Sequence, residues 1–110
     1  MEPIDFNGID TAVHGPVRLG VLTALQMDGK LDFTTLKKRL GVADGALGLH
    51  LRNLEERGYV ECAKAFIGRR PRSTYRVTRA GRSALRVYLQ NMQQLIDAIA
   101  SRGGVDTGSG

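Results

Sequence analysis

Three arginines crowd one short segment, GRRPRSTY, which spans residues 68–75. Arg69, Arg70 and Arg72 surround Pro71, and strand-like runs flank the segment, YVECAKAFI before it and STYRVT after it. A guanidinium group is a planar fork of hydrogen-bond donors, which suits phosphates and base edges better than the single ammonium of lysine does. The pattern predicts a β-hairpin in which GRRPR makes the turn, Pro71 stiffens the tip, and the arginines bind a polyanion.

The positive charge of the chain is concentrated around this segment. The formal net charge of the 110 residues is +5. Residues 64–86 contain eight basic side chains and no acidic one, whereas residues 1–14 contain three acidic side chains and no lysine or arginine. A surface of one sign attracts a polyanion, but a run of charges is also typical of a face that is simply solvated. Composition alone leaves these two interpretations about equally open.

Nothing in the sequence suggests catalysis or metal binding. We find no Ser-His-Asp arrangement, no phosphate-cradling glycine loop and no paired carboxylates in a predicted cleft. His14, His50 and Cys62 are scattered without the spacing of metal ligands. Cys62 stands among apolar strand residues, so we expect it to pack as a small residue and not to serve as a redox thiolate. We therefore expect neither an enzyme nor a cofactor.

Periodicity predicts the elements that position the arginines. Apolar residues at helical spacing indicate one helix over about residues 16–28 and a short one that Thr34 caps and Gly41 ends. A third helix is predicted to begin near Asp44, a favourable cap residue, and Gly58 ends it. LDF, before the second helix, is predicted to be a short strand. The order of helix, short strand, helix, helix and hairpin is typical of a helix-turn-helix with a wing.

A long last helix, which we expect Thr78 to cap, follows the hairpin. Its apolar residues recur at alternating spacings of three and four, an average that is typical of a helix packed against another long helix. The apolar seam of this helix consists of Leu85, Tyr88, Leu89, Met92, Leu95, Ile96 and Ile99.

Three stretches together carry a family resemblance: HGPVRLGVLTAL, then LDFTTLKKRLGVADGALGLHLRNLEERGYVE, then FIGRRPRSTYRVTRAGRSAL. Over about residues 13–90 the chain resembles winged-helix transcriptional regulators of the MarR-like and ArsR-like type, especially short members with little beyond a DNA-binding domain and dimerisation helices. The resemblance implies a mainly α fold with a small β-hairpin wing, and N- and C-terminal helices that form a homodimer. The apolar seam of the last helix is then the predicted dimer interface. We expect one domain over residues 1–100 and a disordered tail over residues 101–110.

The resemblance also implies that the third helix enters the DNA major groove and that the wing reaches along the backbone into the minor groove. Family members tend to carry Asn, Ser or Arg where this chain has Ala46, Gly48 and Leu49, so few side chains remain for base edges. Gly48 in a helix costs about 1 kcal/mol relative to alanine, which close approach of the backbone to DNA would explain. The predicted contacts are Ala46, Gly48, Leu49, His50, Arg52 and Asn53 on the third helix, Lys37 and Lys38 to the DNA backbone, and Arg69, Arg70 and Arg72 on the wing.

The leading hypothesis is a homodimeric regulator that reads double-stranded DNA by sequence or by shape. The alternative is a protein-interaction module on the same fold, because Leu49 would be exposed on a face rich in glycine and alanine. A binder of RNA or single strands ranks lower, since the chain has three Phe, three Tyr and no Trp for stacking. Fold-level analogy leaves open a small-molecule effector between the dimer helices, near Tyr88 and Met92. The chain shows neither a long apolar run nor the layout of a signal peptide, so we expect a cytoplasmic protein without a membrane partner.

Overall fold

Apolar side chains from three helices meet in one core. The computed structural model describes residues 10–102. Its first three helices are α1 (Pro16–Asp28), α2 (Phe33–Leu40) and α3 (Asp44–Glu56). Each helix buries at least one leucine, among them Leu22, Leu36 and Leu51. Because full burial of a leucine contributes about 1.5–3 kcal/mol, this cluster fixes how the helices pack. The helix predicted over residues 16–28 is confirmed.

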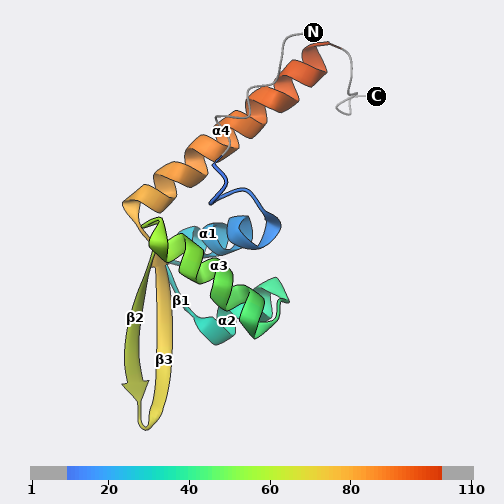
Figure 1. The fold of residues 1–110 in the computed structure, drawn as a ribbon. Helices are drawn as coiled ribbons and strands as arrows, with labels where there is room; N and C mark the ends of the chain where they lie inside the picture. Colours follow the sequence, from blue (N-terminus) through green and yellow to red (C-terminus); the bar gives the residue numbers. More distant parts are fainter. Residues whose placement is uncertain (1–9, 103–110) are drawn as a thin grey trace.

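A three-stranded antiparallel sheet lies beside the helices, in the order β1–β3–β2 (Figure 1). The strands are β1 (Lys30–Asp32), β2 (Val60–Ile67) and β3 (Arg70–Val77). The predicted hairpin and short strand are thus confirmed, and β1 pairs with β3, where Leu31 lies opposite Tyr75. The wing is defined here as β2, β3 and the turn between them.

The turn of the wing is shorter than predicted. Only Gly68 and Arg69 lie outside the two strands, and Gly68 takes a φ of 63°, in the left-handed region that glycine adopts readily. Pro71 belongs to β3, opposite Phe66, and not to the tip. β1 pairs only with residues 74–76 of β3, so Pro71 stands where β3 has a single neighbour and a missing N–H breaks no ladder.

Two predicted helix caps are wrong and one is confirmed. α2 begins at Phe33 because Asp32 Oδ1 accepts a hydrogen bond from the Thr35 N–H at 2.8 Å, so Asp32 and not Thr34 is the cap. At α3 the N-cap is Ala43, without a side-chain cap, and Asp44 is the first helical residue. The prediction for Thr78 is confirmed, since its Oγ1 accepts from the Gly81 N–H at 3.0 Å.

The long helix α4 (Arg79–Ser101) has one half in the core and one half outside it. Near its start, a Cβ on Gly81 would lie 2.2 Å from the carbonyl oxygen of Tyr59, so only glycine permits this close packing. Leu85 and Tyr88 are buried against the other helices. The C-terminal half projects from the body, away from the wing (Figure 1). The tail predicted to be disordered lies outside the described residues, except for Ser101, which ends α4, and Arg102.

The segment before α1 is fastened to the core by side-chain contacts. The Tyr59 hydroxyl donates to Asp10 Oδ2, and this hydrogen bond is the main reason that the pKa of Tyr59 is raised. His14 Nδ1 and the Tyr88 hydroxyl are 3.0 Å apart. These contacts join residues 10–14 to the connection between α3 and β2 and to α4.

Candidate nucleic-acid interface

The wing projects beyond the rest of the sheet. β1 ends at the pair Asp32–Thr74, and four further residue pairs of β2 and β3 continue past it, from Lys64–Ser73 to Ile67–Arg70. At about 3.3 Å per residue, this extension measures roughly 13 Å before the turn. Nearly all of its residues are exposed. The two strands therefore form an arm that extends beyond the rest of the molecule (Figure 1).

The three predicted wing arginines are all exposed at this arm. Arg69 lies in the turn, and Arg70 and Arg72 lie two residues apart in β3, so their side chains share one face. Within residues 10–102, Arg69 and Arg70 have no acidic side chain in ion-pair contact. Arg72 Nε lies 3.7 Å from Asp32 Oδ2. The tip thus offers two uncompensated guanidinium groups.

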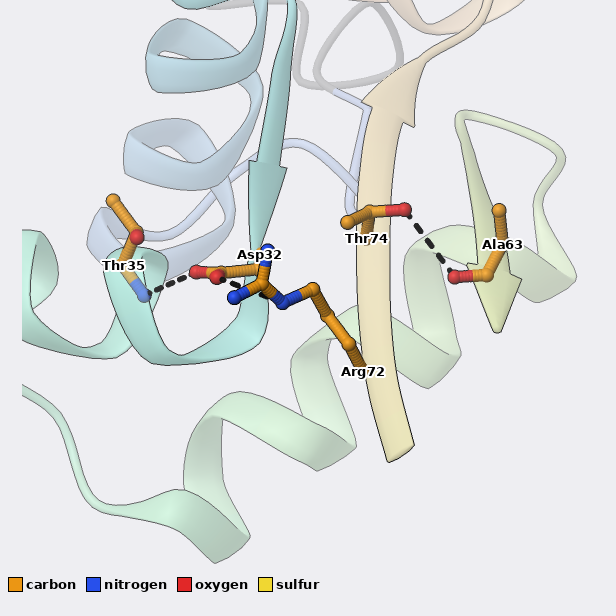
Figure 2. Close-up of polar contacts among 5 residues, drawn as sticks. All are labelled: Asp32, Thr35, Ala63, Arg72 and Thr74. Carbon is orange, nitrogen blue, oxygen red and sulfur yellow. Dashed lines mark hydrogen bonds and ion pairs between the residues drawn. The ribbon is translucent and has the colours of Figure 1, made fainter. Parts of the chain in front are cut away.

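Acidic residues from outside the basic stretch partly balance the base of the wing. Figure 2 shows Asp32 between two partners, with Oδ1 accepting from Thr35 and Oδ2 facing Arg72. Hydrogen bonds from Thr35, followed by the charge of Arg72, hold the pKa of Asp32 below its usual value. Arg76, which like Arg72 lies in β3, forms an ion pair with Glu61, with 2.8 Å between Nη2 and Oε2. Positive charge therefore increases from the base of the wing toward its tip.

Four predicted contact residues of α3 lie on its outward half and are called the α3 ridge: Ala46, Gly48, Leu49 and Arg52. Leu49 is 56% exposed, Ala46 and Arg52 are exposed, and Gly48 is half-buried. A Cβ on Gly48 would meet no atom within 4 Å, so packing within the chain does not require glycine there. The ridge is slim, and Arg52 is its only long polar side chain.

The other two predicted α3 contacts are less accessible than Leu49 and Arg52. His50 is half-buried on the flank, and its Nδ1 is buried with no hydrogen-bond partner among the described residues. Asn53 is half-buried and lines a surface hollow of about 390 Å³ together with Thr11 and Arg18 of the N-terminal region. Helical periodicity alone did not show that residues 10–14 fold back beside Asn53.

The lysines of α2 differ in their surroundings. Lys37 Nζ lies 2.8 Å from Asp44 Oδ1, so this ion pair joins α2 to the start of α3. Lys38 is exposed and forms no ion pair within the described residues. Arg39 pairs with Asp28 at the end of α1. Of the two lysines predicted to contact the DNA backbone, Lys38 is the one whose charge is free.

Comparison with known proteins identifies the architecture. A family model described as a winged helix DNA-binding domain matches residues 17–96. The chain belongs to this family. The predicted resemblance to winged-helix regulators is thereby confirmed, as is the predicted fold of mainly helical structure with a small β wing.

Individual proteins are similar to this winged-helix chain in sequence or in fold. It is 37% identical over 79 residues to an uncharacterised protein of Methanocaldococcus jannaschii, a match that covers 72% of this chain and 86% of the relative. A transcriptional regulator homologue from Pyrococcus horikoshii superposes with a TM-score of 0.73 at 32% identity, covering 80% and 87% of the two chains. The PcaV transcriptional regulator from Streptomyces coelicolor, solved with its natural ligand, gives a TM-score of 0.70 at 20% identity, covering 93% and 70%, a likeness of fold alone.

The predicted dimer-interface residues of the winged-helix chain divide into two groups. Leu85 and Tyr88 are 4% and 6% exposed because the core of their own chain covers them, so they leave little surface for a second copy. Met92 is half-buried and packs against that core. The remaining four lie farther out or on the open side of α4: Leu95 is half-buried, and Leu89, Ile96 and Ile99 are exposed.

Sites for other ligands are limited within residues 10–102. No group of three or more His, Cys, Asp or Glu side chains in this range is placed to hold a metal ion. Cys62 is half-buried and packs against the core, close to Tyr75, whose pKa burial raises to about 12. None of the described helices is both long enough and apolar enough to cross a bilayer.

Proposed function

We propose that this winged-helix chain is a transcriptional regulator that binds double-stranded DNA as a homodimer, with no catalytic step. The α3 ridge enters the major groove, and the wing follows the backbone into the minor groove. The observation that carries the proposal is the pair of uncompensated guanidinium groups, Arg69 and Arg70, on an arm that projects from a DNA-binding fold. Arginine in a narrow minor groove gains from its strongly negative potential.

The shape of the α3 ridge sets how this chain reads DNA. Arg52 is suited to a guanine edge, and the methyl groups of Ala46 and Leu49 are suited to thymine methyl groups. These contacts specify few bases, so much of the discrimination comes from groove shape and deformability. The open space at Gly48 supports a close approach of the helix backbone to the groove floor.

The exposed half of α4 supports the homodimer. The helix has 23 residues and is therefore about 34 Å long. Its projecting half bears exposed Ile96 and Ile99, and a short helix without a packing partner is only marginally stable in water. A second copy of α4 covers these side chains and places two α3 helices one turn of DNA apart, about 34 Å.

A small-molecule effector between the dimer helices is also part of this proposal. The structural neighbour PcaV was solved with a ligand. In the present chain Tyr88 is buried and hydrogen-bonded to His14. An effector near Tyr88 and Met92 therefore acts by breaking this hydrogen bond.

The salt dependence of DNA affinity tests the proposed function. If each subunit neutralises three or four phosphates, the slope of log affinity against log salt for the dimer is about −5 to −7. The measurement is a fluorescence anisotropy titration of labelled duplex at several salt concentrations. A flat dependence, or no binding to any duplex at low salt, contradicts the proposal. Sequencing of genomic fragments retained by the purified protein then defines the operator.

A protein-interaction module is the second candidate, and the 56% exposed Leu49 favours it. Replacing Arg69, Arg70 and Arg72 together by alanine separates the two candidates. A DNA-binding protein loses affinity for duplex in this variant. If a protein partner is still captured and the unmodified chain never binds DNA, the interaction module is the correct function.

A further inference from the structure

We propose that the wing tip carries an apolar wedge, Phe66 backed by Pro71, which enters between base pairs from the minor groove and bends the duplex. This inference rests on the proposed function, because it requires that the wing meets double-stranded DNA. It adds a second action of the wing, deformation of the DNA, to the charge contacts of the arginines.

The register of the hairpin assembles the wedge. Phe66 pairs with Pro71, so the two rings lie side by side on one face of the wing. The same face carries Cys62 and Tyr75 nearer the body, where the core covers them. Four residues farther along β2, Phe66 is 74% exposed, and no other element of residues 10–102 covers it. The pair Lys64–Ser73 separates Phe66 and Pro71 from the covered part of this face, so the wedge is an isolated apolar spot on the arm.

The arginines occupy positions around the wedge and not within it. Arg70 pairs with Ile67, and Arg72 pairs with Ala65, on the face opposite to Phe66. Arg69 lies beyond both strands in the turn. The tip thus combines the exposed rings of Phe66 and Pro71 on one face with Arg70 and Arg72, beside Ile67, on the other. This combination fits a partner that presents anionic walls and an apolar interior. The minor groove has this layout, with phosphates on both sides of the stacked bases.

Association of two wings with each other is the weaker explanation for the exposed Phe66. Two tips that each carry Arg69, Arg70 and Arg72 repel one another. Pro71 also lacks the N–H that an added strand would bond, and proline and charge on an edge are known to prevent edge-to-edge pairing. The same features leave the apolar face available for an anionic partner.

The physics of DNA bending predicts where the wedge acts. Apolar side chains inserted at a base step unstack it partly and kink the duplex toward the major groove. Steps such as TA and CA/TG unstack most easily, so the wing is expected to settle where such a step lies under Phe66. This gives the protein a sequence preference at positions that the α3 ridge does not touch.

Tryptophan fluorescence tests the wedge directly, because the natural chain contains no tryptophan. Phe66→Trp places a single reporter on the wedge face, and Ile67→Trp places a matched reporter on the opposite face. On saturation with duplex, the Phe66→Trp emission is expected to lose most of its intensity through stacking on bases, while the Ile67→Trp emission changes little. Anisotropy of the labelled duplex shows independently that DNA is bound.

Ligase-catalysed cyclisation of a duplex of about 100 bp, shorter than the persistence length of about 150 bp, measures the bend. The unmodified protein is expected to raise the cyclisation rate on the order of tenfold, and Phe66→Ala to return it toward the value for bare DNA while the duplex stays bound. Phe66→Leu, which keeps an apolar side chain, is expected to retain part of the bend.

The outcomes separate this inference from the function on which it rests. If the duplex is bound but Phe66→Trp is not quenched and Phe66→Ala does not alter cyclisation, the wedge is refuted and DNA binding stands. If no duplex is bound, both proposals fail. If the Phe66→Trp emission shifts to the blue with anionic phospholipid vesicles and does not respond to duplex, the apolar tip serves a membrane surface and the wedge is refuted.

Discussion

The carboxylate of Asp32 and the guanidinium of Arg72 face each other across the junction between the helix-turn-helix and the wing, with 3.7 Å between Oδ2 and Nε (Figure 2). The other oxygen of Asp32 caps α2 through Thr35. One side chain therefore fixes the start of a helix and restrains a wing residue. Together with the pairing of β1 and β3, it sets the orientation of the wing relative to α2 and α3.

Replacing Asp32 by asparagine separates these two roles. Asparagine is an equally good N-cap, and an exposed ion pair is worth only about 0–1 kcal/mol, so Asp32→Asn is expected to unfold at nearly the same urea concentration. Asp32→Ala loses the cap and is expected to be about 1 kcal/mol less stable. In Asp32→Asn, Arg72 has lost its ion pair and contacts a DNA phosphate instead. The affinity for DNA is therefore expected to rise, and the slope of log affinity against log salt to steepen by about 0.9 per subunit. Weaker DNA binding by Asp32→Asn would show that Arg72 acts only when Asp32 holds it.

The pH dependence of stability reports the same carboxylate. Since the pKa of Asp32 is lowered in the folded chain, its ionised form stabilises the fold above the usual value of 3.8. That contribution is lost as the pH falls through the lowered pKa. The difference in unfolding free energy between the natural chain and Asp32→Asn is therefore expected to be constant above about pH 5 and to shift against the natural chain below 3.8. Urea titrations at each pH measure this difference in unfolding free energy. If acidification shifts the difference in favour of the natural chain, the ionised Asp32 does not stabilise the fold.

The order of the elements could be read from the sequence because apolar spacing and glycine positions are local signals. The caps were harder, because several neighbouring residues are of a type that can cap a helix. Asp32 accepts from the Thr35 N–H and is the cap, so α2 begins at Phe33, earlier than a cap at Thr34 allows. Asp44 was a suitable cap by type, but it lies at the first helical position and pairs with Lys37, a contact between two helices that no local pattern reveals.

Long-range packing also decided which candidate site residues are free. The regular apolar seam of α4 gave no sign that its first half would be buried by its own chain at Leu85 and Tyr88. Similarly, Asn53 has the right residue type and helical position for a DNA contact, but the returning N-terminal segment lies beside it. Arg69 and Leu49 were predicted as exposed with more success, because a hairpin tip and the outer face of a helix have few neighbours.

Replacing Gly48 by alanine is expected to raise the stability of the fold and to lower the affinity for DNA. The Cβ meets no atom within 4 Å, so Gly48→Ala stabilises α3 by about 1 kcal/mol. The same methyl group holds the helix away from the groove floor, and DNA affinity is expected to fall by at least about tenfold, or 1.4 kcal/mol. Thermal unfolding and duplex titration of the same sample measure both effects. Unchanged DNA affinity would mean that α3 does not approach the duplex at this position.

Replacing Gly81 by alanine is expected to lower the stability of the fold, in contrast to Gly48→Ala. A Cβ there would lie 2.2 Å from the Tyr59 carbonyl oxygen, which is backbone and cannot turn aside. Gly81→Ala is therefore expected to destabilise the chain by about 1–3 kcal/mol, as overpacking of a core does. Urea unfolding compares it with Gly48→Ala, and a neutral effect would show that α4 can shift away from Tyr59.

Removal of the two free wing arginines is expected to weaken DNA binding and its salt dependence together. For Arg69→Ala combined with Arg70→Ala, the salt slope becomes shallower by about 0.9 for each phosphate that the variant no longer neutralises. Arg82→Ala combined with Arg86→Ala removes the same charge from α4 and serves as the matched control, with a much smaller effect. If both double variants bind DNA with equally reduced affinity, net charge and not the wing governs binding.

A charge on the open side of α4 is expected to split the dimer without unfolding the monomer. Leu89 and Ile96 are 52% and 50% exposed in the single chain, so glutamate at both positions leaves the core intact. In a dimer the same carboxylates would be buried without partners, which is strongly destabilising. Sedimentation velocity is expected to show a monomer for Leu89→Glu combined with Ile96→Glu and a dimer for Gln94→Glu, which adds a charge on the opposite side of the helix.

Since a monomer places only one α3 helix on DNA, the double variant is also expected to show roughly half of the salt slope. A natural chain that sediments as a monomer at the concentrations that saturate DNA would contradict the homodimer.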